Sequence, residues 1–142
     1  MPIQTPKGHR MQILILDDDH DLAASLEALV EKLGHAVTLA HDCETARALA
    51  YSSPFDFILA DVELPDGDGR VACESLRSEG ASQDAYMIAM TGRADLGNDD
   101  FAAFDGYLHK PITFDLLERV LGEWQTAAGL SATKPGAAEG LI

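Results

Sequence analysis

The sequence predicts an α/β domain built around a five-stranded parallel sheet. Short apolar runs, of the kind that form buried strands, alternate with segments whose apolar residues recur at helical spacing. The alternation occurs five times, and 142 residues suffice for one domain with a sizeable core. Successive strand and helix units favour a parallel sheet with right-handed crossover connections.

The predicted strands share short runs of apolar, often β-branched residues. They cover residues 11–16, 36–40, 55–60, 86–90 and 106–109. The first run, MQILIL, is nearly continuous, as expected of a strand that helices cover on both faces. Each run is therefore placed inside the sheet.

The predicted helices lie between and after these strands. The first carries an apolar stripe before Gly34, a residue typical of a helix end, and others are expected over 44–51 and 71–79. The last begins at an N-cap, Thr113, and is expected to pack Trp124 on the sheet. The stripe residues of the first and last helices are Leu22, Leu26, Leu29, Val30, Leu33, Leu117, Val120, Leu121 and Trp124.

The two ends lack this periodicity. Residues 1–10 are polar, and residues 128–142 are rich in Gly, Ala, Pro and Ser, so both are expected to be tails around a domain of residues 11–127, the C-terminal one flexible. The N-terminus has no apolar signal-peptide core, and no run approaches the roughly 18 apolar residues of a membrane span. A cytoplasmic location is expected.

The chain is strongly acidic. Lys and Arg number 10 against 24 Asp and Glu, a formal charge of −14 that opposes binding to nucleic acid or to anionic membranes. Two cysteines, Cys43 and Cys73, show neither disulfide nor zinc spacing, so free thiols in a reducing compartment are expected. The five histidines also lack ligand spacing, and surface or loop positions are expected for them. Cation-dependent or basic partners fit this composition best.

Polar residues gather where the predicted strands end. Asp17, Asp18 and Asp19 follow the first strand, Asp61 the third, Thr91 the fourth and Lys110 the fifth. In an open parallel sheet, ligands bind beyond the carboxyl ends of the strands. Neighbouring carboxylates repel by on the order of 4 kcal/mol per close pair, so a hard cation such as Mg²⁺ is expected among them.

These residues form a set suited to an aspartyl phosphate. A carboxylate attacks phosphorus while a metal, a lysine and a hydroxyl donor stabilise charge on the phosphoryl oxygens. Gly92 would leave the backbone open to the phosphoryl group. By contrast, DGDG at 66–69 lacks the Gly and Glu that a calcium loop needs, and predicts a turn.

Four segments together resemble the receiver domain of two-component response regulators, over about residues 11–126. They are ILILDDDH, ILADVELPDGDG, MIAMTG and GYLHKPI, in the order of the family. The resemblance implies a flavodoxin-like doubly wound sheet of strand order 2-1-3-4-5. It also implies a phosphoacceptor switch, stand-alone and not a turnover enzyme, that works with a histidine kinase or histidine phosphotransfer protein and a downstream protein target.

The resemblance also implies roles for particular residues. Asp61 would be the phosphoacceptor and Lys110 its partner, whereas Thr91 and Tyr107 would form the switch pair. Mg²⁺ would be held by Asp18 directly, by Asp17 through water, by Asp61 and by the backbone carbonyl of Glu63. Side chains at Glu63 and Arg93 would flank the path of the attacking water and set the lifetime of the phosphoryl group.

One segment departs from the family pattern. The span from Thr91 to Lys110 is shorter than usual and offers only a stub, at about 99–104, for the fourth helix. A three-turn helix needs about eleven residues. The usual output face is therefore expected to be altered, with switching concentrated in the loop after Thr91 and in the fifth strand.

Two other functions fit parts of the sequence. Haloacid-dehalogenase-type phosphatases also use an aspartate after the first strand, and Asp17 and Asp19 have that spacing, but His20 and Asp21 stand where Gly and Thr are needed. The other alternative is a receiver-fold interaction module that works without phosphorylation. The completeness of the set Asp18, Asp61, Thr91 and Lys110 argues against it.

Overall fold

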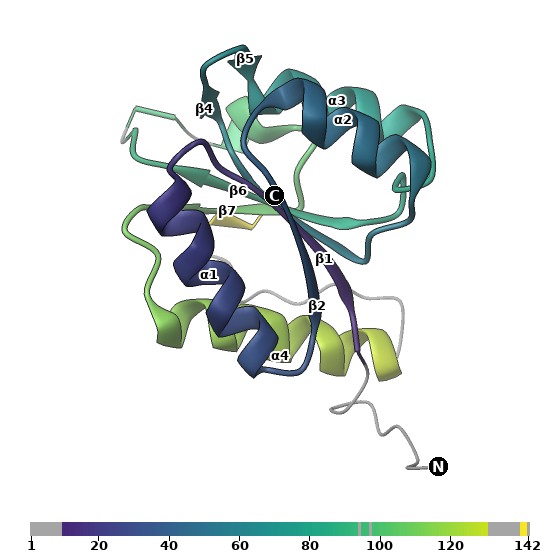
Figure 1. Ribbon diagram of the computed structural model, residues 1–142, viewed down its shortest axis with the longest axis vertical. Helices are drawn as coiled ribbons and strands as arrows, with labels where there is room; N and C mark the ends of the chain where they lie inside the picture. Colours follow the sequence, from purple (N-terminus) through teal and green to yellow (C-terminus); the bar gives the residue numbers. More distant parts are fainter. Residues whose placement is uncertain (1–9, 94, 97, 131–139, 142) are drawn as a thin grey trace.

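The computed structural model describes residues 10–93, 95–96, 98–130 and 140–141. A central sheet lies between two layers of helices, with α2 and α3 on one face and α1 and α4 on the other (Figure 1). The strand order is β2-β1-β3-β6-β7-β8, and every pair from β2 to β7 is parallel. The predicted order 2-1-3-4-5 is thus confirmed, with β6 and β7 as its fourth and fifth strands.

The elements have the following bounds. The strands of the main sheet are β1 Gln12–Leu16, β2 Ala36–Ala40, β3 Phe57–Asp61, β6 Tyr86–Thr91, β7 Gly106–His109 and β8 Gly140–Leu141. The helices are α1 His20–Lys32, α2 Cys43–Ser52, α3 Gly69–Ser78 and α4 Phe114–Leu130. A small hairpin pairs β4 Glu63–Leu64 with β5 Gly67–Asp68. The predicted strands and helices lie within two residues of these bounds wherever the prediction named both ends.

Local side-chain contacts define the helix starts. The Asp19 carboxylate caps α1 by accepting a hydrogen bond from the Leu22 N–H at 3.0 Å, and Asp42 caps α2 through the Thr45 N–H at 2.7 Å. The predicted cap at Thr113 is confirmed, since its hydroxyl accepts from the Leu116 N–H at 3.2 Å. At the other end of α1, Gly34 adopts a φ of 99°, which favours glycine.

The core has two parts, one on each face of the sheet. Alternate residues of β1 and β3 point to opposite faces, because side chains alternate along a strand. Leu14 and Ile58 pack with α2 and α3, whereas Ile13 and Leu59 pack with α1 and α4. Both parts of the core are therefore anchored on the central strands, and the strand ends carry the polar groups.

The helix expected between β6 and β7 is reduced to one 3₁₀ turn, η1 Asn98–Phe101, as the short span predicts. Arg77 of α3 holds the chain that follows. Its guanidinium donates to the carbonyl oxygens of Ala103 and Ala85 at 2.8 Å each and to Asp105 Oδ2 at 3.0 Å. Asp105 Oδ2 also accepts from the Met87 N–H at 2.8 Å. A fixed guanidinium thus stabilises a segment that has too few residues for a regular helix.

Two expectations need amendment. Helix α4 runs to Leu130, three residues past the predicted domain boundary, and residues 140–141 of the expected C-terminal tail form β8. His35 lies in the loop between α1 and β2, which agrees with the expected surface or loop position, but it is buried there and its Nδ1 accepts a hydrogen bond from the Met11 N–H at 3.1 Å. The packing expected of the Trp124 side chain lies outside the described part of the structure.

Within the described residues, no helix is long and apolar enough to cross a membrane.

Candidate metal and phosphoryl site at the carboxyl edge of the sheet

The parallel register brings the predicted site residues to one edge. Asp17 follows β1, Asp61 ends β3, Thr91 ends β6 and Lys110 follows β7. Asp17, Asp61 and Thr91 are all buried, although Asp18 is exposed. The polar groups therefore meet at the floor of the site, with Asp18 at its rim.

Lys110 joins the two buried carboxylates. Its Nζ lies 3.1 Å from Asp61 Oδ2 and 3.1 Å from Asp17 Oδ2. The contact to Asp61 has hydrogen-bond geometry, and the contact to Asp17 is an ion pair without it. One lysine thus serves two carboxylates, so the buried site keeps an excess of negative charge.

Backbone donors hold the other oxygen of each carboxylate. Asp17 Oδ1 accepts from the Asp19 N–H at 2.9 Å, and Asp61 Oδ1 accepts from the Glu63 N–H at 3.2 Å. Asp17 Oδ2, by contrast, is fully buried and has no hydrogen-bond donor within the described structure. Lys110 Nζ lies 3.1 Å from this oxygen without hydrogen-bond geometry, so a second cation or a water would stabilise the buried carboxylate further.

The arrangement fits a hard divalent cation. One carboxylate oxygen from each of Asp17, Asp18 and Asp61 can be chosen so that all three lie within 4.8 Å of one another. Oxygen ligands at this spacing, together with water, suit Mg²⁺. A cation here would add a second positive charge near Asp17 Oδ2, which Lys110 already contacts.

The surroundings of Asp61 change its protonation. Burial raises the pKa of Asp61 most, and the charge of Asp17 adds to this, whereas the Glu63 N–H and Lys110 lower it; the net shift is upward. For Lys110, burial acts to lower the pKa, but the close contact with Asp17 and the charge of Asp61 outweigh it, and the net shift is upward. Lys110 therefore stays charged. Ionisation of Asp61 in the folded protein, by contrast, lowers the free energy of unfolding.

This cost leads to a prediction for Asp61→Asn in metal-free protein. Because the folded-state pKa of Asp61 lies above its unfolded value, its favourable contribution exists at low pH and is lost as pH rises through the folded-state pKa. We expect Asp61→Asn to be more stable than wild type at neutral pH, with the difference vanishing below about pH 3.9. Urea unfolding across this range measures it, and a neutral-pH midpoint at or below that of wild type contradicts the prediction.

The predicted switch residues lie on neighbouring strands. Thr91 is fully buried, and its Oγ1 accepts from the Arg93 N–H at 2.9 Å. Tyr107, on β7, is half-buried and stacks on Phe101 of η1, with ring centroids 4.6 Å apart. The aromatic ring therefore packs on the 3₁₀ turn that replaces the usual helix.

The two residues predicted to set the phosphoryl lifetime lie on loops at this edge. The Arg93 guanidinium pairs with Asp95, at 3.1 Å and 2.7 Å, and this contact is the main reason that the pKa of Arg93 is raised. Glu63 contributes to the same shift at longer range. In this structure, then, Arg93 pairs with Asp95, and this ion pair lies within the loop after β6.

Sequence reasoning missed two supports of the site. Gly69 lies against the backbone of Asp61, so closely that a Cβ built on it would stand 2.1 Å from the Asp61 carbonyl oxygen. Asp66, in the predicted turn, accepts from the N–H groups of Cys43 and Glu44 at 2.8 Å and 3.1 Å. The Cys43 contact is the largest cause of the lowered pKa of Asp66. The only sequence signal for either contact was the turn composition DGDG.

A histidine pair was missed as well. The rings of His20 and His41 stack with centroids 3.8 Å apart, and His41 Nδ1 lies 2.8 Å from the carbonyl oxygen of Asp17. When Nδ1 carries the proton, it donates to that carbonyl and holds the loop after β1. No sequence spacing indicated this contact, because the residues come from α1 and from the connection between β2 and α2.

Comparison with known proteins agrees with the fold and identifies the family. The profile of the family described as the response regulator receiver domain matches residues 13–121. The chain therefore belongs to the response regulator receiver domain family of two-component signalling. This membership favours a signalling switch over the phosphatase alternative.

Similar full-length proteins are much longer. The chain is 30% identical over 135 residues to the signal transduction histidine-protein kinase BarA of Escherichia coli K12, covering 93% of this chain and 15% of that protein. It is 34% identical over 122 residues to the sensor histidine kinase AruS of Pseudomonas aeruginosa, covering 82% and 12%. The chain thus spans a small part of these kinases.

Solved structures of single receiver domains match along nearly their whole length. The receiver domain of a sensor histidine kinase from Pseudomonas aeruginosa PAO1, solved with a magnesium ion coordinated in the active site cleft, has a TM-score of 0.75 and 30% identity, covering 83% of this chain and 99% of that one. A CheY-like receiver domain from Methanospirillum hungatei has a TM-score of 0.74 and 30% identity, with coverage of 85% and 100%.

Proposed function

We propose that this chain is a receiver that accepts a phosphoryl group on Asp61 in the presence of Mg²⁺ and thereby switches a partner-binding surface. The observation that carries the proposal is the contact of Lys110 Nζ with both Asp17 Oδ2 and Asp61 Oδ2, of which Asp17 Oδ2 is buried and has no hydrogen bond within the described structure. Such a site is organised for added anionic oxygens and a cation.

In the proposed reaction, an oxygen of Asp61 attacks phosphorus of a phosphohistidine, and the bond from phosphorus to the imidazole nitrogen breaks with its electron pair on nitrogen. The imidazole leaves and the acyl phosphate remains on Asp61. Lys110 Nζ, already 3.1 Å from Asp61 Oδ2, then pairs with the phosphoryl oxygens. Asp18, Asp61 and the Glu63 carbonyl, with Asp17 acting through water, would hold Mg²⁺, which would neutralise charge on those oxygens.

The proposed switch uses the residues next to the site. On phosphorylation, the Thr91 hydroxyl, whose oxygen now accepts from the Arg93 N–H, would move towards the phosphoryl group and donate its proton to a phosphoryl oxygen. The Tyr107 ring would turn inward behind it, leaving its stack on Phe101. Because both rearrangements meet on η1 and β7, the proposed output lies there and not on a long helix.

We expect Glu63 and Arg93 to control the lifetime of the phosphoryl group. Arg93 would exchange Asp95 for the phosphoryl group and Glu63, closing the path of the attacking water. Replacing both Glu63 and Arg93 with alanine should therefore speed phosphate loss, measured by the decay of labelled protein after the donor is removed. Asp95→Ala is the matched control, because it frees Arg93 without removing it. An unchanged decay rate in the double variant would show that no such closure operates.

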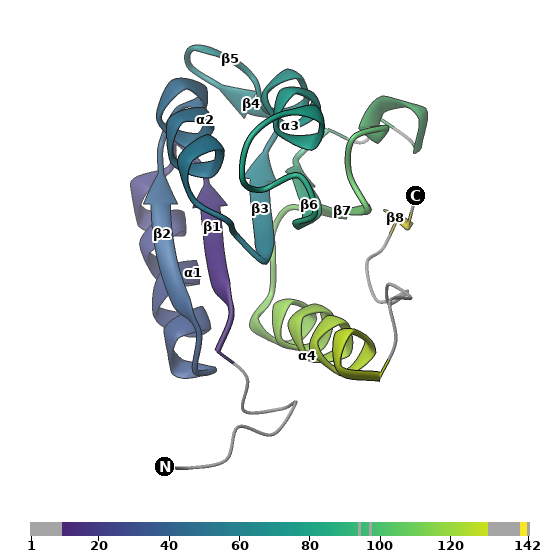
Figure 2. The ribbon, with the colours of Figure 1, turned by 90° about the vertical axis from the view of Figure 1, so that its right-hand side faces the viewer.

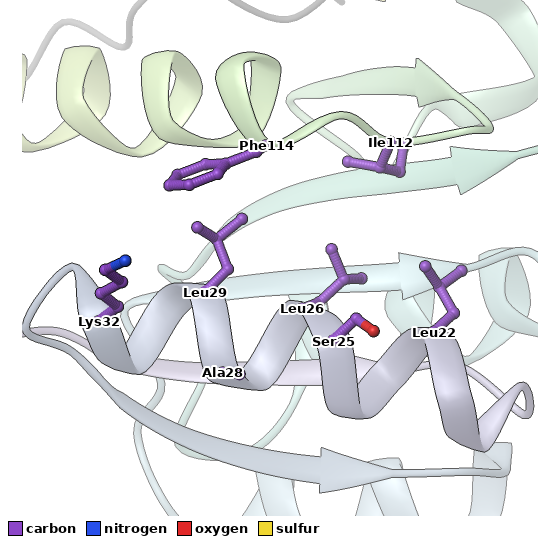
Figure 3. Close-up of a pocket in the computed structure, with 8 residues that line it drawn as sticks. All are labelled: Leu22, Ser25, Leu26, Ala28, Leu29, Lys32, Ile112 and Phe114. Atoms are coloured by element: carbon purple, nitrogen blue, oxygen red, sulfur yellow. The ribbon is translucent and has the colours of Figure 1, made fainter.

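A histidine-phosphorylated protein needs a surface beside Asp61 on which to dock. An apolar groove runs between α1 and the start of α4, with Leu22, Leu26 and Leu29 facing Ile112 and Phe114 (Figure 3). It begins next to the site, since Leu22 donates to Asp19 and Ile112 lies two residues after Lys110. Phe114 is 49% exposed and continues the apolar lining of this groove, and a contiguous exposed apolar surface is typical of interaction sites. We propose that the phosphodonor protein docks here.

Comparing a protein phosphodonor with a small-molecule phosphodonor distinguishes an effect on docking from an effect on the phosphorylation reaction. Phe114→Ser should slow transfer from a histidine-phosphorylated protein about tenfold, as loss of a buried aromatic anchor typically does. It should leave labelling by acetyl phosphate unchanged, because a small molecule needs no docking surface. Tyr51→Ser, which removes an equally exposed aromatic from α2, is the control. Equal transfer rates in wild type and Phe114→Ser would refute docking in this groove.

The same experiment addresses the remaining alternative. A phosphorylation-independent interaction module would take label from neither donor. The proposed location is the cytoplasm, where histidine phosphodonors act on receivers. The two free thiols, Cys43 and Cys73, are compatible with its reducing conditions.

A further inference from the structure

The outer edge of β7 is paired with another part of the same chain. Gly140–Leu141 form β8, which runs antiparallel to β7 with Gly106 opposite Leu141 and Tyr107 opposite Gly140 (Figure 2). Antiparallel pairing at an edge strand uses its outward N–H and C=O groups, which otherwise form a template for any extended chain. This edge therefore accepts a strand, and the occupant is residues 140–141.

The occupied edge is directly connected to the phosphoryl site. Tyr107, the residue opposite Gly140, lies three positions before Lys110, whose Nζ contacts Asp17 and Asp61. On its inner side, β7 pairs with β6, where Ala89 is opposite Tyr107 and Thr91 is opposite His109. A change at Thr91 or Lys110 thus acts on the strand that β8 pairs with.

Among its described residues, the connection between β6 and β7 contains only the short turn η1, and β7 packs next to this turn. The Tyr107 ring packs on Phe101 of η1, and the chain between them is held by Arg77 through Ala103 and Asp105. β8 contributes only two residues, so its pairing is marginal by comparison with the strands of the parallel sheet. A pairing this short can be exchanged for another strand.

We propose that the outer edge of β7 is a docking site for an extended polypeptide strand, and that Gly140–Leu141 occupy it as a built-in competitor. An extended segment of a downstream protein would replace β8 and add antiparallel to β7, using main-chain hydrogen bonds for affinity. The exchange would change the surroundings of Tyr107, because this residue is paired with Gly140 of β8. The inference goes beyond the proposed phosphorylation of Asp61 and does not depend on it.

The test changes the backbone donors of β8 within the full chain. Gly140→Pro with Leu141→Pro removes both N–H groups, whereas Gly140→Ala with Leu141→Ala keeps them and is the matched control. Amide hydrogen exchange across residues 104–109 should be about tenfold faster in the double-proline variant and unchanged in the double-alanine variant. Exchange in β1 and β3 should stay the same, which verifies that both variants are folded.

A peptide then tests the exchange of strands. A fluorescent peptide of residues 135–142 should bind the double-proline variant at least tenfold more tightly than wild type, because a tethered strand competes at an effective concentration on the order of 1 mM. The proposal is overturned if amide hydrogen exchange is equal in the double-proline and double-alanine variants, or if the peptide binds the double-proline variant and wild type equally. So does protection of residues 104–109 that falls as wild-type protein is diluted, since the occupant would then be a second copy.

Discussion

Replacing Gly69 with alanine should lower the free energy of unfolding by about 3 kcal/mol, at the upper end of the range for overpacking. A Cβ at Gly69 would stand 2.1 Å from the Asp61 carbonyl oxygen, 3.2 Å from the Asp61 carbonyl carbon and 3.3 Å from Val62 Cα. These neighbours are backbone atoms of β3 and its continuation, and the Gly69 N–H donates to the Val62 carbonyl oxygen at 3.0 Å. The clash cannot be relieved by rotating a side chain.

The same substitution should also disturb the site, because the backbone that must move carries Asp61. Urea unfolding measures the loss of stability, and acetyl phosphate labelling measures the loss of reactivity. Gly122→Ala is the control: a Cβ there meets nothing within 4 Å, and alanine in a helix interior is favoured over glycine by up to about 1 kcal/mol. A Gly69→Ala variant as stable as wild type would show that the contact between this residue and β3 can relax without loss.

Replacing Lys110 with methionine should slow phosphorylation of Asp61 about a hundredfold, the usual effect of removing one preorganised group that stabilises a transition state. The lysine contacts both buried carboxylates, so its loss leaves Asp17 and Asp61 without their shared cation. The pKa of Asp61, already raised by burial and lowered by Lys110, should then rise further. Less of the nucleophilic carboxylate would be present near neutral pH.

Initial labelling rates with acetyl phosphate, measured at several pH values, check this expectation. Lys32→Met makes the same charge change on α1, away from Asp61, and should label at the wild-type rate. In Lys110→Met the pH below which labelling declines should move upward, which a purely structural defect would not produce. A wild-type rate and an unshifted pH profile would remove Lys110 from the proposed chemistry.

The sequence predicted that the proposed site residues meet at one edge of the sheet, because the positions of the strand ends follow from the topology. Asp61, Thr91 and Lys110 come from three different strand ends, yet any parallel sheet brings such ends to one edge. The buried strands were equally clear, since uninterrupted apolar runs have few alternatives in an α/β domain. The shortened connection between β6 and β7 was visible as a simple count of residues.

Contacts between residues distant in sequence were not predictable in this way. Nothing in the periodicity indicates that Arg77 reaches the carbonyl oxygens of Ala85 and Ala103, or that Gly69 packs on Asp61. The pairing of β8 with β7 was also missed, because Gly140–Leu141 is too short to carry a strand pattern. Arg93 was expected to act with Glu63, whereas its nearest charged partner, Asp95, lies two residues along the same loop.

Intact mass after incubation with acetyl phosphate and Mg²⁺ tests the central claim most directly. Wild type should gain one phosphoryl group, the gain should require Mg²⁺, and Asp61→Ala should gain none. Asp56→Ala serves as the control, because Asp56 lies at the opposite end of β3, where its carboxylate accepts from the Gln12 N–H at 2.8 Å. Label that persists in Asp61→Ala, or a wild-type protein that takes none, would contradict the assignment of Asp61 as the phosphoacceptor.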